Sequence, residues 1–292
     1  MPGSDDHDAL RRARTVGVYG LGREGTAIVR YLRTAAPDAT VEAYLDGDPD
    51  DAVRTVAADL DVMLVGGADA VVGRLSSGEV DVVVRSPGVP LRGAGLAAAR
   101  DHGVRVSSGT NLWFEREAPD NAVVVTGTKG KSTTSSLLAH LLAADCRDVA
   151  LLGNIGRPLL DHDRAASDSD VVVVELSSYQ LADLHEPISV GVWLNLHAEH
   201  LDWHGSHAAY ARDKGRVVGL SRTKVPARPR ETTRPVRRSA CQAALTVAGE
   251  TPSSAATSRT VGSRSPGARA PERIPRLKAP AMPRGERSSM AP

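Results

Sequence analysis

Cysteine, aromatic side chains and long apolar runs are scarce in this 292-residue chain. Its two cysteines, Cys146 and Cys241, are far apart and have no metal-ligand spacing, which excludes a disulfide framework and is typical of a reducing compartment. No apolar run reaches the length of a membrane span, and the first residues lack the apolar core of a secretion signal. The sequence therefore predicts a cytoplasmic protein with no membrane partner.

Aspartate, histidine and aromatic residues are missing after position 220. Residues 221–292 hold 15 Lys and Arg against four Glu and no Asp, which leaves 21 basic and 31 acidic residues in positions 1–220. The tail thus carries a net charge of +11 and the rest of the chain −10. Ten of the 18 prolines also lie in the tail. Such a segment cannot bury enough apolar surface to offset its ordering entropy, so we expect the Arg/Pro/Ser-rich residues 220–292 to be disordered.

The basic tail has three interpretations. It could be an arm that binds nucleic acid or another anionic surface, a passive extension, or the product of a reading frame altered near Gly219. Its basic residues form no compact cluster and have no aromatic neighbours that could stack on bases. We therefore favour the last two interpretations and expect no nucleic-acid partner. Residues 1–14, acidic and then basic, are also expected to be disordered.

Alternating strand and helix patterns indicate an α/β protein. Residues 15–46 have the order strand, glycine turn, helix and strand, which is typical of a parallel sheet with crossover helices. After the polar segment 109–121 the alternation of strands and helices begins again. Its strands are near-continuous runs of Val, Leu and Ile, which indicates burial on both faces. We expect a Rossmann-like domain over residues 15–108, a linker over 109–121, and a second α/β unit over 122–219.

The sequence TGTKGKST, residues 126–133, lies between a β-branched strand and a predicted helix. Gly127 and Gly130 would let backbone N–H groups and the helix dipole bind an anion, Lys131 would neutralise phosphate, and the Ser132 hydroxyl can ligate Mg²⁺. The loop is shorter than the common G-x-x-x-x-G-K-[ST] pattern, because position 125 is Val. A glycine turn with a solvated lysine is the alternative, but the preceding strand and the apolar positions of the helix favour a phosphate loop. These positions are Leu137, Leu138, Leu141 and Leu142.

An earlier glycine turn, GLGREG, has glycines at positions 20, 22 and 25 and lies between a strand and a helix. Asp46 ends the next strand, at the position from which an acid binds a ribose hydroxyl. The pattern suits NAD in an oxidoreductase, but it also suits other nucleoside diphosphate ligands. A second phosphate loop has no place in a simple dehydrogenase, which favours the other ligands.

Three further segments carry ionisable side chains. Glu175 ends the buried strand of VVVVELSSYQL, where open α/β sheets bind ligands, and Glu is almost never buried unpaired. Acidic and imidazole groups after the next strand favour metal ligation beside a nucleotide, although spaced histidines also occur in solvated loops. These groups are Glu199, His200, Asp202 and His204. Lys214 follows them, and most lysines are surface charges.

Four segments occur in an order and spacing that resemble the Mur ligases. They are VTGTKGKSTT, GNIGRPLL, ELSSYQL and EHLDWHGSHAAYARDK, and the N-terminal GLGREG and RSPGVP share the resemblance. The similarity covers roughly residues 15–218. It implies a Rossmann-like first domain that binds UDP rather than NAD, followed by an incomplete ATP-binding domain with a short phosphate loop.

The resemblance is strongest to the branch that adds glutamate to UDP-N-acetylmuramoyl-L-alanine in peptidoglycan synthesis, and hence in cell-wall biogenesis, cell shape, the cell cycle and cell division. It implies that a substrate carboxylate attacks the γ-phosphate of ATP to give an acyl phosphate, from which the glutamate amine displaces phosphate. It also implies ATP and Mg²⁺ as cofactors, small molecules as the partners, and a monomer. The segments look more like the L-glutamate branch than the D-glutamate branch.

The resemblance assigns roles to particular side chains. The ATP-binding loop comprises Gly127, Thr128, Lys129, Gly130, Lys131, Ser132 and Thr133. The catalytic residues are Lys131, which contacts the β- and γ-phosphates, and Glu175, His200 and Lys214. The metal ligands are Ser132 and Glu175 for one Mg²⁺ and His200 and carbamylated Lys214 for a second. The UDP substrate is held by Gly22, Arg23, Glu24, Gly25, Asp46, Ser86, Asn154 and Ser177.

The pattern departs from the Mur ligases near Val218, where the Arg/Pro tail begins. The family continues with the rest of the ATP domain and a further domain of roughly 130 residues. An open half-sheet exposes strand edges and apolar surface, which favours aggregation. We therefore expect this chain to be truncated or frameshifted, and inactive or nearly so. The alternatives are a folylpolyglutamate-synthase-like ligase and a non-catalytic nucleotide-binding fragment.

Overall fold

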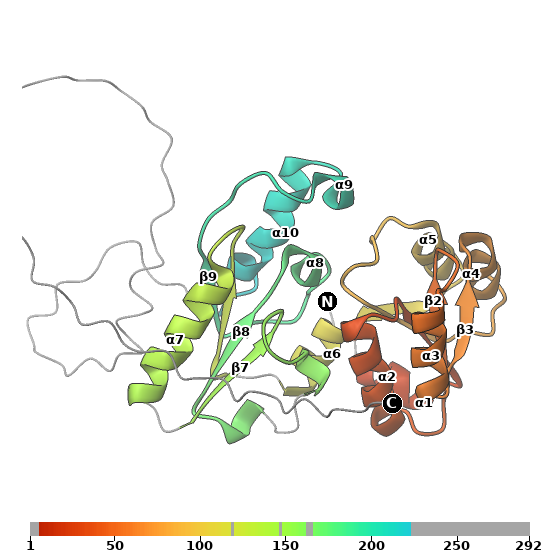
Figure 1. Cartoon of the computed structure of the whole chain (residues 1–292), viewed down its shortest axis with the longest axis horizontal. Helices are drawn as coiled ribbons and strands as arrows, with labels where there is room; N and C mark the ends of the chain where they lie inside the picture. Colours follow the sequence, from red (N-terminus) through yellow and green to blue (C-terminus); the bar gives the residue numbers. More distant parts are fainter. Residues whose placement is uncertain (1–5, 118–119, 146–147, 162–165, 223–292) are drawn as a thin grey trace, which may run out of the picture. The chain divides into compact units, whose positions relative to one another are not determined.

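Two parallel sheets and the helices around them make up the part of the chain that the structure describes (Figure 1). The computed structural model describes residues 6–117, 120–145, 148–161 and 166–222, all within one compact unit. The tail predicted to be disordered lies outside the described residues from position 223 onward. Its first residues still belong to the fold, because Arg222 N donates to Ile188 O at 2.9 Å. None of the described helices has both the length and the apolar character needed to cross a membrane.

The first sheet has five parallel strands in the order β3-β2-β1-β4-β5. These strands are β1 (Thr15–Tyr19), β2 (Thr40–Leu45), β3 (Met63–Gly66), β4 (Val82–Arg85) and β5 (Arg105–Ser108). Its helices are α2 (Arg23–Ala35), α3 (Asp51–Asp59), α4 (Ala68–Leu75) and α5 (Ala94–Asp101). Every residue of β4 is buried, and Ile28 and Leu32 of α2 share a core cluster with β1. The predicted alternation of strands and helices is confirmed.

The second sheet has four parallel strands in the order β7-β8-β6-β9. These strands are β6 (Ala122–Thr126), β7 (Val149–Gly153), β8 (Val171–Glu175) and β9 (Val190–Trp193). The helices are α7 (Lys131–Asp145), α8 (Ser178–Leu181), α9 (Leu201–His204) and α10 (His207–Gly219), with short 3-10 turns η1 (Leu159–Asp161) and η2 (Ala166–Asp168). Helix α7 packs on β7 and β8, and α10 packs on β9. The α/β fold class is confirmed for both sheets, whereas the exact domain limits stay a prediction.

Helix α7 follows the phosphate loop as predicted, but its buried face is narrower than the sequence suggests. Of its four leucines, only Leu142 is fully buried, and Leu138 is half-buried. Leu137 and Leu141 are 55% and 48% exposed. Residues four positions apart share a helix face, so the four leucines form two stripes. Only the stripe of Leu138 and Leu142 belongs to the core on the second sheet.

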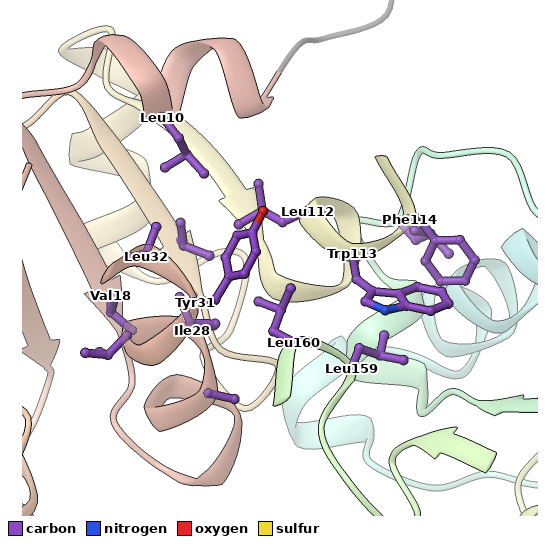
Figure 2. Close-up of a cluster of buried hydrophobic side chains, with 14 of the residues drawn as sticks. Leu10, Val18, Ile28, Tyr31, Leu32, Leu112, Trp113, Phe114, Leu159 and Leu160 are labelled. Atoms are coloured by element: carbon purple, nitrogen blue, oxygen red, sulfur yellow. The ribbon is translucent and has the colours of Figure 1, made fainter. Parts of the chain in front are cut away.

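The segment predicted as a linker, residues 109–121, is helical over most of its length. Helix α6 (Gly109–Glu117) buries Trp113 and Phe114, whose rings meet edge to face at a centroid distance of 4.9 Å. Figure 2 shows this pair close to Leu159 and Leu160 of η1, with side chains of α2 beyond them. The linker prediction overlooked this helix because, apart from the aromatic pair, the segment is polar.

The prediction of a disordered N-terminus is wrong for residues 6–12, which form helix α1 (Asp6–Arg12). Leu10 is buried in the core, and the buried Asp6 accepts hydrogen bonds from Arg105 Nε at 2.8 Å and from Ser107 Oγ. Both partners belong to β5, about 100 positions along the chain. Contacts that are remote in sequence therefore order a segment whose own composition suggests disorder.

Candidate functional site

The candidate site lies at the carboxyl edge of the second sheet. Strand β6 has β8 on one side and β9 on the other, and the chain leaves β6 through α7 toward the far edge at β7. Ligands of open α/β sheets bind at such a point, because the loops that follow neighbouring strands diverge there. The phosphate loop follows β6, Glu175 ends β8, and Asn154 directly follows β7.

Glycines shape the turn between β6 and α7. Gly130 has a φ of 78°, in the left-handed region that favours glycine. A Cβ atom at Gly127 would lie 2.9 Å from Leu194 Cβ, so the turn passes close to the segment after β9. Helix α7 begins at Lys131, and the first N–H groups of a helix have no partners within it. The turn thus has the backbone features of an anion site.

Side chains from the segment after β9 and from α10 hold this loop in place. The Thr128 hydroxyl lies 2.9 Å from the Tyr210 hydroxyl and accepts a hydrogen bond from His197 N at 2.9 Å. The Asn195 side chain pairs with both main-chain groups of Lys129 at 3.0 Å. Sequence reasoning missed Asn195 and Tyr210, because only the strand order brings them to the loop.

The two lysines of the loop have different surroundings. Lys131 Nζ donates to Thr128 O at 3.1 Å, so its ammonium lies over the turn. The Lys129 side chain is 72% exposed and forms an ion pair with Glu199. Ser132 is exposed in the first turn of α7. The structure thus places the predicted ATP-binding residues at one turn, with a cation above it.

Glu175 is fully buried. Its Oε1 accepts a hydrogen bond from Asn154 Nδ2 at 2.9 Å, whereas its Oε2 has no hydrogen-bond partner among the described residues. A buried carboxylate oxygen without a partner carries a large desolvation cost. A divalent cation with a preference for oxygen ligands would supply that partner. Glu175 therefore fits the predicted role of a Mg²⁺ ligand.

Lys214 is also buried, and its ammonium contacts the phosphate loop. Its Nζ donates to Gly127 O at 2.8 Å and lies 5.1 Å from the centroid of the Tyr210 ring. Burial, together with the nearby charge of Lys131, lowers the pKa of Lys214 to about 8. A larger fraction of this amine is therefore neutral near physiological pH than of an exposed lysine, and only the neutral amine can act as a nucleophile.

His200 is exposed, and its φ of 55° is uncommon for a residue other than glycine. Its ring lies 5.0 Å from that of Tyr179. Backbone strain of this kind is frequent at ligand sites. Nevertheless, no group of three or more His, Cys, Asp or Glu side chains that could hold a metal ion occurs within the described residues. The second predicted metal site, of His200 and Lys214, therefore stays a prediction.

The carboxyl edge of the first sheet carries the other predicted site, between β1 and β4, where the strand order reverses. Gly20 has a φ of 90°, and a Cβ atom at Gly25 would lie 1.9 Å from Gly20 O, so α2 can approach the turn only with glycine there. Ser86 Oγ donates to Gly20 O at 2.6 Å. The structure thus brings Ser86 and the glycine turn together, and their binding of UDP stays a prediction.

Two predicted acidic residues flank this turn. Asp46 is exposed after β2 and accepts a hydrogen bond from the Tyr19 hydroxyl. Burial raises the pKa of Glu24, in the first turn of α2, to about 6. The carboxyl group of Glu24 is thus less readily ionised than an exposed one, which suits a position near an expected diphosphate.

Of three further predicted residues, Arg23 and Asn154 connect the two predicted sites, and Ser177 makes a local contact. Arg23 Nη2 donates to Asn154 O at 3.1 Å, which joins the N-terminus of α2 to the segment after β7. Ser177 caps α8, because its hydroxyl accepts from Gln180 N at 3.2 Å. The segment that follows Glu175 is therefore fixed by its own cap, whether or not Ser177 contacts a substrate.

Sequence reasoning missed Arg85, which lies between the two sites. Its guanidinium is fully buried and binds the Asp183 carboxylate through two hydrogen bonds of 3.0 and 2.8 Å. It also donates to three carbonyl oxygens of the loop after β4 and to Tyr179 O. Arg85 therefore connects the loop that includes Ser86 to helix α8. The available signal was an arginine at the end of an otherwise apolar buried strand.

A cavity of about 140 Å³ lies away from these sites, at the start of the strands of the second sheet. It is lined by the first residues of β6, β8 and β9 and by Leu138 and Leu142 of α7. Because no residue of the phosphate loop lines it, this cavity is not part of the candidate site.

Comparison with known proteins defines the class to which this fold and site correspond. Residues 125–227 match the family model described as the Mur ligase middle domain. The matched segment includes the whole phosphate loop together with Glu175, His200 and Lys214. The resemblance to the Mur ligases is therefore confirmed for this segment.

Two relatives that are similar in sequence to this chain share the name UDP-N-acetylmuramoyl-L-alanine--L-glutamate ligase. That of Xanthomonas campestris pv. campestris is 42% identical over 221 residues, which cover 73% of this chain and 46% of the relative. That of Micromonospora sp. is 45% identical over 208 residues, which cover 70% of this chain and 43% of the relative. The chain thus spans a little under half the length of these relatives. A solved structure, UDP-N-acetylmuramate:L-alanyl-gamma-D-glutamyl-meso-diaminopimelate ligase from Neisseria meningitides, aligns with a TM-score of 0.47 and 20% identity over 72% of this chain and 69% of that chain.

Proposed function

We propose that this chain carries the nucleotide-binding part of an ATP-dependent ligase that adds L-glutamate to UDP-N-acetylmuramoyl-L-alanine in peptidoglycan synthesis. The names of the relatives support this substrate and the L-configuration. The observation that carries the proposal is the convergence of the phosphate loop, the buried Glu175 and the buried Lys214 at one sheet edge. Such a cytoplasmic, monomeric ligase would contribute to cell-wall biogenesis, cell shape and cell division.

The phosphate loop would hold ATP. Backbone N–H groups of the turn and of the start of α7 bind the phosphates, and Lys131 exchanges its bond to Thr128 O for a phosphate oxygen. Ser132 and Glu175 would hold Mg²⁺, which neutralises charge on the phosphoryl group during transfer. The unpartnered Oε2 of Glu175 supports this assignment.

The chemistry proceeds in two displacements. The substrate carboxylate attacks the γ-phosphorus while the bond to the ADP oxygen breaks, and the glutamate amine then attacks the acyl carbon, so that phosphate leaves and the amine loses a proton. Negative charge develops first on phosphoryl oxygens and then on the acyl oxygen, and Lys131 lies where it can stabilise the first of these. The lowered pKa of Lys214 favours its carbamylation, because only a neutral amine attacks CO₂.

The first sheet would hold the UDP group. The turn from Gly22 to Gly25 at the N-terminus of α2 offers backbone N–H groups to a diphosphate, and Asp46 lies after the neighbouring strand β2. The hydrogen bond from Arg23 to Asn154 O joins this turn to the segment beside Glu175. A nucleotide substrate bound at the first turn could therefore extend its carboxylate toward the second.

Isothermal titration calorimetry tests the two sites separately and does not depend on turnover. We expect UDP-N-acetylmuramoyl-L-alanine to bind, and a non-hydrolysable ATP analogue to bind in the presence of Mg²⁺. Lys131→Ala should weaken the ATP analogue by about tenfold, because it removes a charge-assisted hydrogen bond, and leave the UDP substrate unaffected. Asp46→Asn should weaken binding of the UDP substrate and leave the ATP analogue unaffected.

The alternatives give different results in the same titrations. No detectable affinity for UDP-N-acetylmuramoyl-L-alanine would contradict the proposal, and binding of a folate instead would favour a folylpolyglutamate-synthase-like ligase. Binding of the ATP analogue alone would favour a non-catalytic nucleotide-binding fragment. Glu175→Gln should abolish the effect of Mg²⁺ on the affinity for the ATP analogue, and it should leave the affinity measured in EDTA unchanged. Glu42→Gln, at a buried carboxylate of the first sheet, should change neither affinity.

A further inference from the structure

The sequence groups His204 with candidate metal ligands, but the structure buries it between two other side chains. His204 ends α9 and is 3% exposed. Its Nδ1 lies 2.8 Å from Asp213 Oδ2, and its Nε2 lies 3.0 Å from Ser178 Oγ. Asp213, His204 and Ser178 therefore form a continuous hydrogen-bonded chain from α10 to α8.

The order of these groups is that of a Ser-His-Asp catalytic triad, but burial excludes nucleophilic catalysis. Ser178 and Asp213 are 2% and 7% exposed, so a substrate carbonyl has no access to the Ser178 hydroxyl. Nucleophilic catalysis requires that the hydroxyl reach the reacting carbon. The chain of hydrogen bonds must therefore act within the protein.

Geometry also defines the tautomer of His204. The Asp213 carboxylate can only accept, so Nδ1 carries a proton, and in the neutral ring Nε2 accepts from the Ser178 hydroxyl. The ring stacks on Tyr179 at a centroid distance of 5.7 Å and meets the edge of Tyr210 at 5.1 Å. Burial lowers the pKa of His204 in spite of Asp213, which agrees with a neutral ring.

The two ends of this series of hydrogen bonds, Ser178 and Asp213, adjoin the two buried ionisable groups of the candidate site. Ser178 begins α8, three residues after Glu175, and Asp213 directly precedes Lys214 on α10. Lys214 in turn donates to Gly127 O of the phosphate loop. We infer that His204 is a positioning residue, which ties α10 to the junction after Glu175 and thereby holds Lys214 against the phosphate loop. The inference rests on the proposed function only for the catalytic value of that position.

Labelling of lysines with an amine-reactive reagent, quantified by peptide mass spectrometry, tests this inference. Lys214 is 1% exposed and should react slowly relative to Lys129, whose side chain is 72% exposed. Ser178→Ala and His204→Ala should each raise the labelling of Lys214 relative to Lys129 by about fivefold, because loss of a buried hydrogen bond favours local opening. Asp213→Asn keeps an oxygen acceptor for His204 Nδ1, so its labelling of Lys214 should stay close to that of wild type.

Tyr44→Phe is the matched control, because it removes a buried hydroxyl that donates to Glu42 in the first sheet. Unchanged Lys214 labelling in Ser178→Ala would overturn the inference, as would an equal rise in Tyr44→Phe. Ser178→Ala is a small change that keeps the test valid if His204→Ala does not fold. Because the readout needs no nucleotide, a wild type that fails to bind the ATP analogue would refute the proposed function and leave the labelling result to decide the role of His204.

Discussion

At the scale of single residues, the burial of Lys214 makes stability depend on pH. Its pKa is lowered from 10.5 to about 8 in the folded chain, so between these values the unfolded chain binds more protons than the folded one. The contribution of Lys214 to stability is therefore lowest below pH 8 and rises from pH 8 to 10.5, by on the order of 3 kcal/mol. Urea unfolding of wild type and Lys214→Met across this range measures the effect. A difference between them that does not vary with pH would contradict it.

Arg85 is the residue whose loss should destabilise the fold most clearly. Arg85→Met removes the buried donor of the hydrogen bonds to the Asp183 carboxylate and to four carbonyl oxygens, of which Ser86 O keeps a second donor, Val89 N. We expect a loss of about 3 kcal/mol in the free energy of unfolding. Arg30→Met is the matched control, because Arg30 is 58% exposed in its ion pair with Asp161 and should cost less than about 1 kcal/mol. Thermal denaturation of both variants gives the comparison, and equal losses would show that Arg85 has no special role.

Single residues were predictable where the local sequence determines their position. Gly127, Gly130 and Lys131 lie within one turn, so their spacing alone indicated the phosphate loop. Asn195 contacts Lys129 across 66 positions, and Arg85 contacts Asp183 across 98. No periodicity within one segment encodes such pairs, because they depend on which strands become neighbours.

At the scale of elements, the two leucine stripes of α7 should respond differently to substitution. Leu142 is 1% exposed, and Leu142→Ala should cost about 3 kcal/mol through lost burial and a cavity. Leu137→Lys and Leu141→Lys should change the free energy of unfolding by less than about 0.5 kcal/mol, because both side chains are largely in solvent. They should also reduce self-association in light scattering, since they remove exposed apolar surface. Unfolding of either lysine variant would mean that this face is covered in solution.

Strands were more predictable than helices for a physical reason. Runs such as VVVVE of β8 and VVVR of β4 are buried on both faces and stand out in the sequence. Helix α3 was not predicted, although the Asp50 side chain caps it by accepting from Val53 N at 2.8 Å. The segment of α6 was predicted to be a linker, because two aromatic side chains in a polar segment have no helical period. Short helices whose burial comes from tertiary contacts leave little local signal.

At the scale of the whole described chain, the sequence indicated two α/β units but not how their cores connect. One cluster of buried apolar residues includes Val18 and Val84 of the first sheet and Val124 and Val174 of the second. Helix α6 and turn η1 contribute Trp113 and two leucines to the same cluster (Figure 2). A continuous core favours cooperative unfolding of both sheets, because neither sheet can lose its packing without exposing part of the other.

This connection predicts a single unfolding transition. Val84→Ala and Val174→Ala remove equal volume from fully buried positions in different sheets, and each should cost about 2 kcal/mol and lower the same denaturation midpoint. Val218→Ala is the control, because Val218 is 53% exposed and its truncation should leave the midpoint unchanged. Tryptophan fluorescence and far-ultraviolet circular dichroism, followed together during urea unfolding, should give coincident curves for every variant. If the sheets were independent, Val84→Ala would shift only one of two resolved transitions and Val174→Ala only the other. Coincident curves would therefore mean that a ligand bound at either sheet edge stabilises the whole described chain, by an amount fixed by its concentration and dissociation constant.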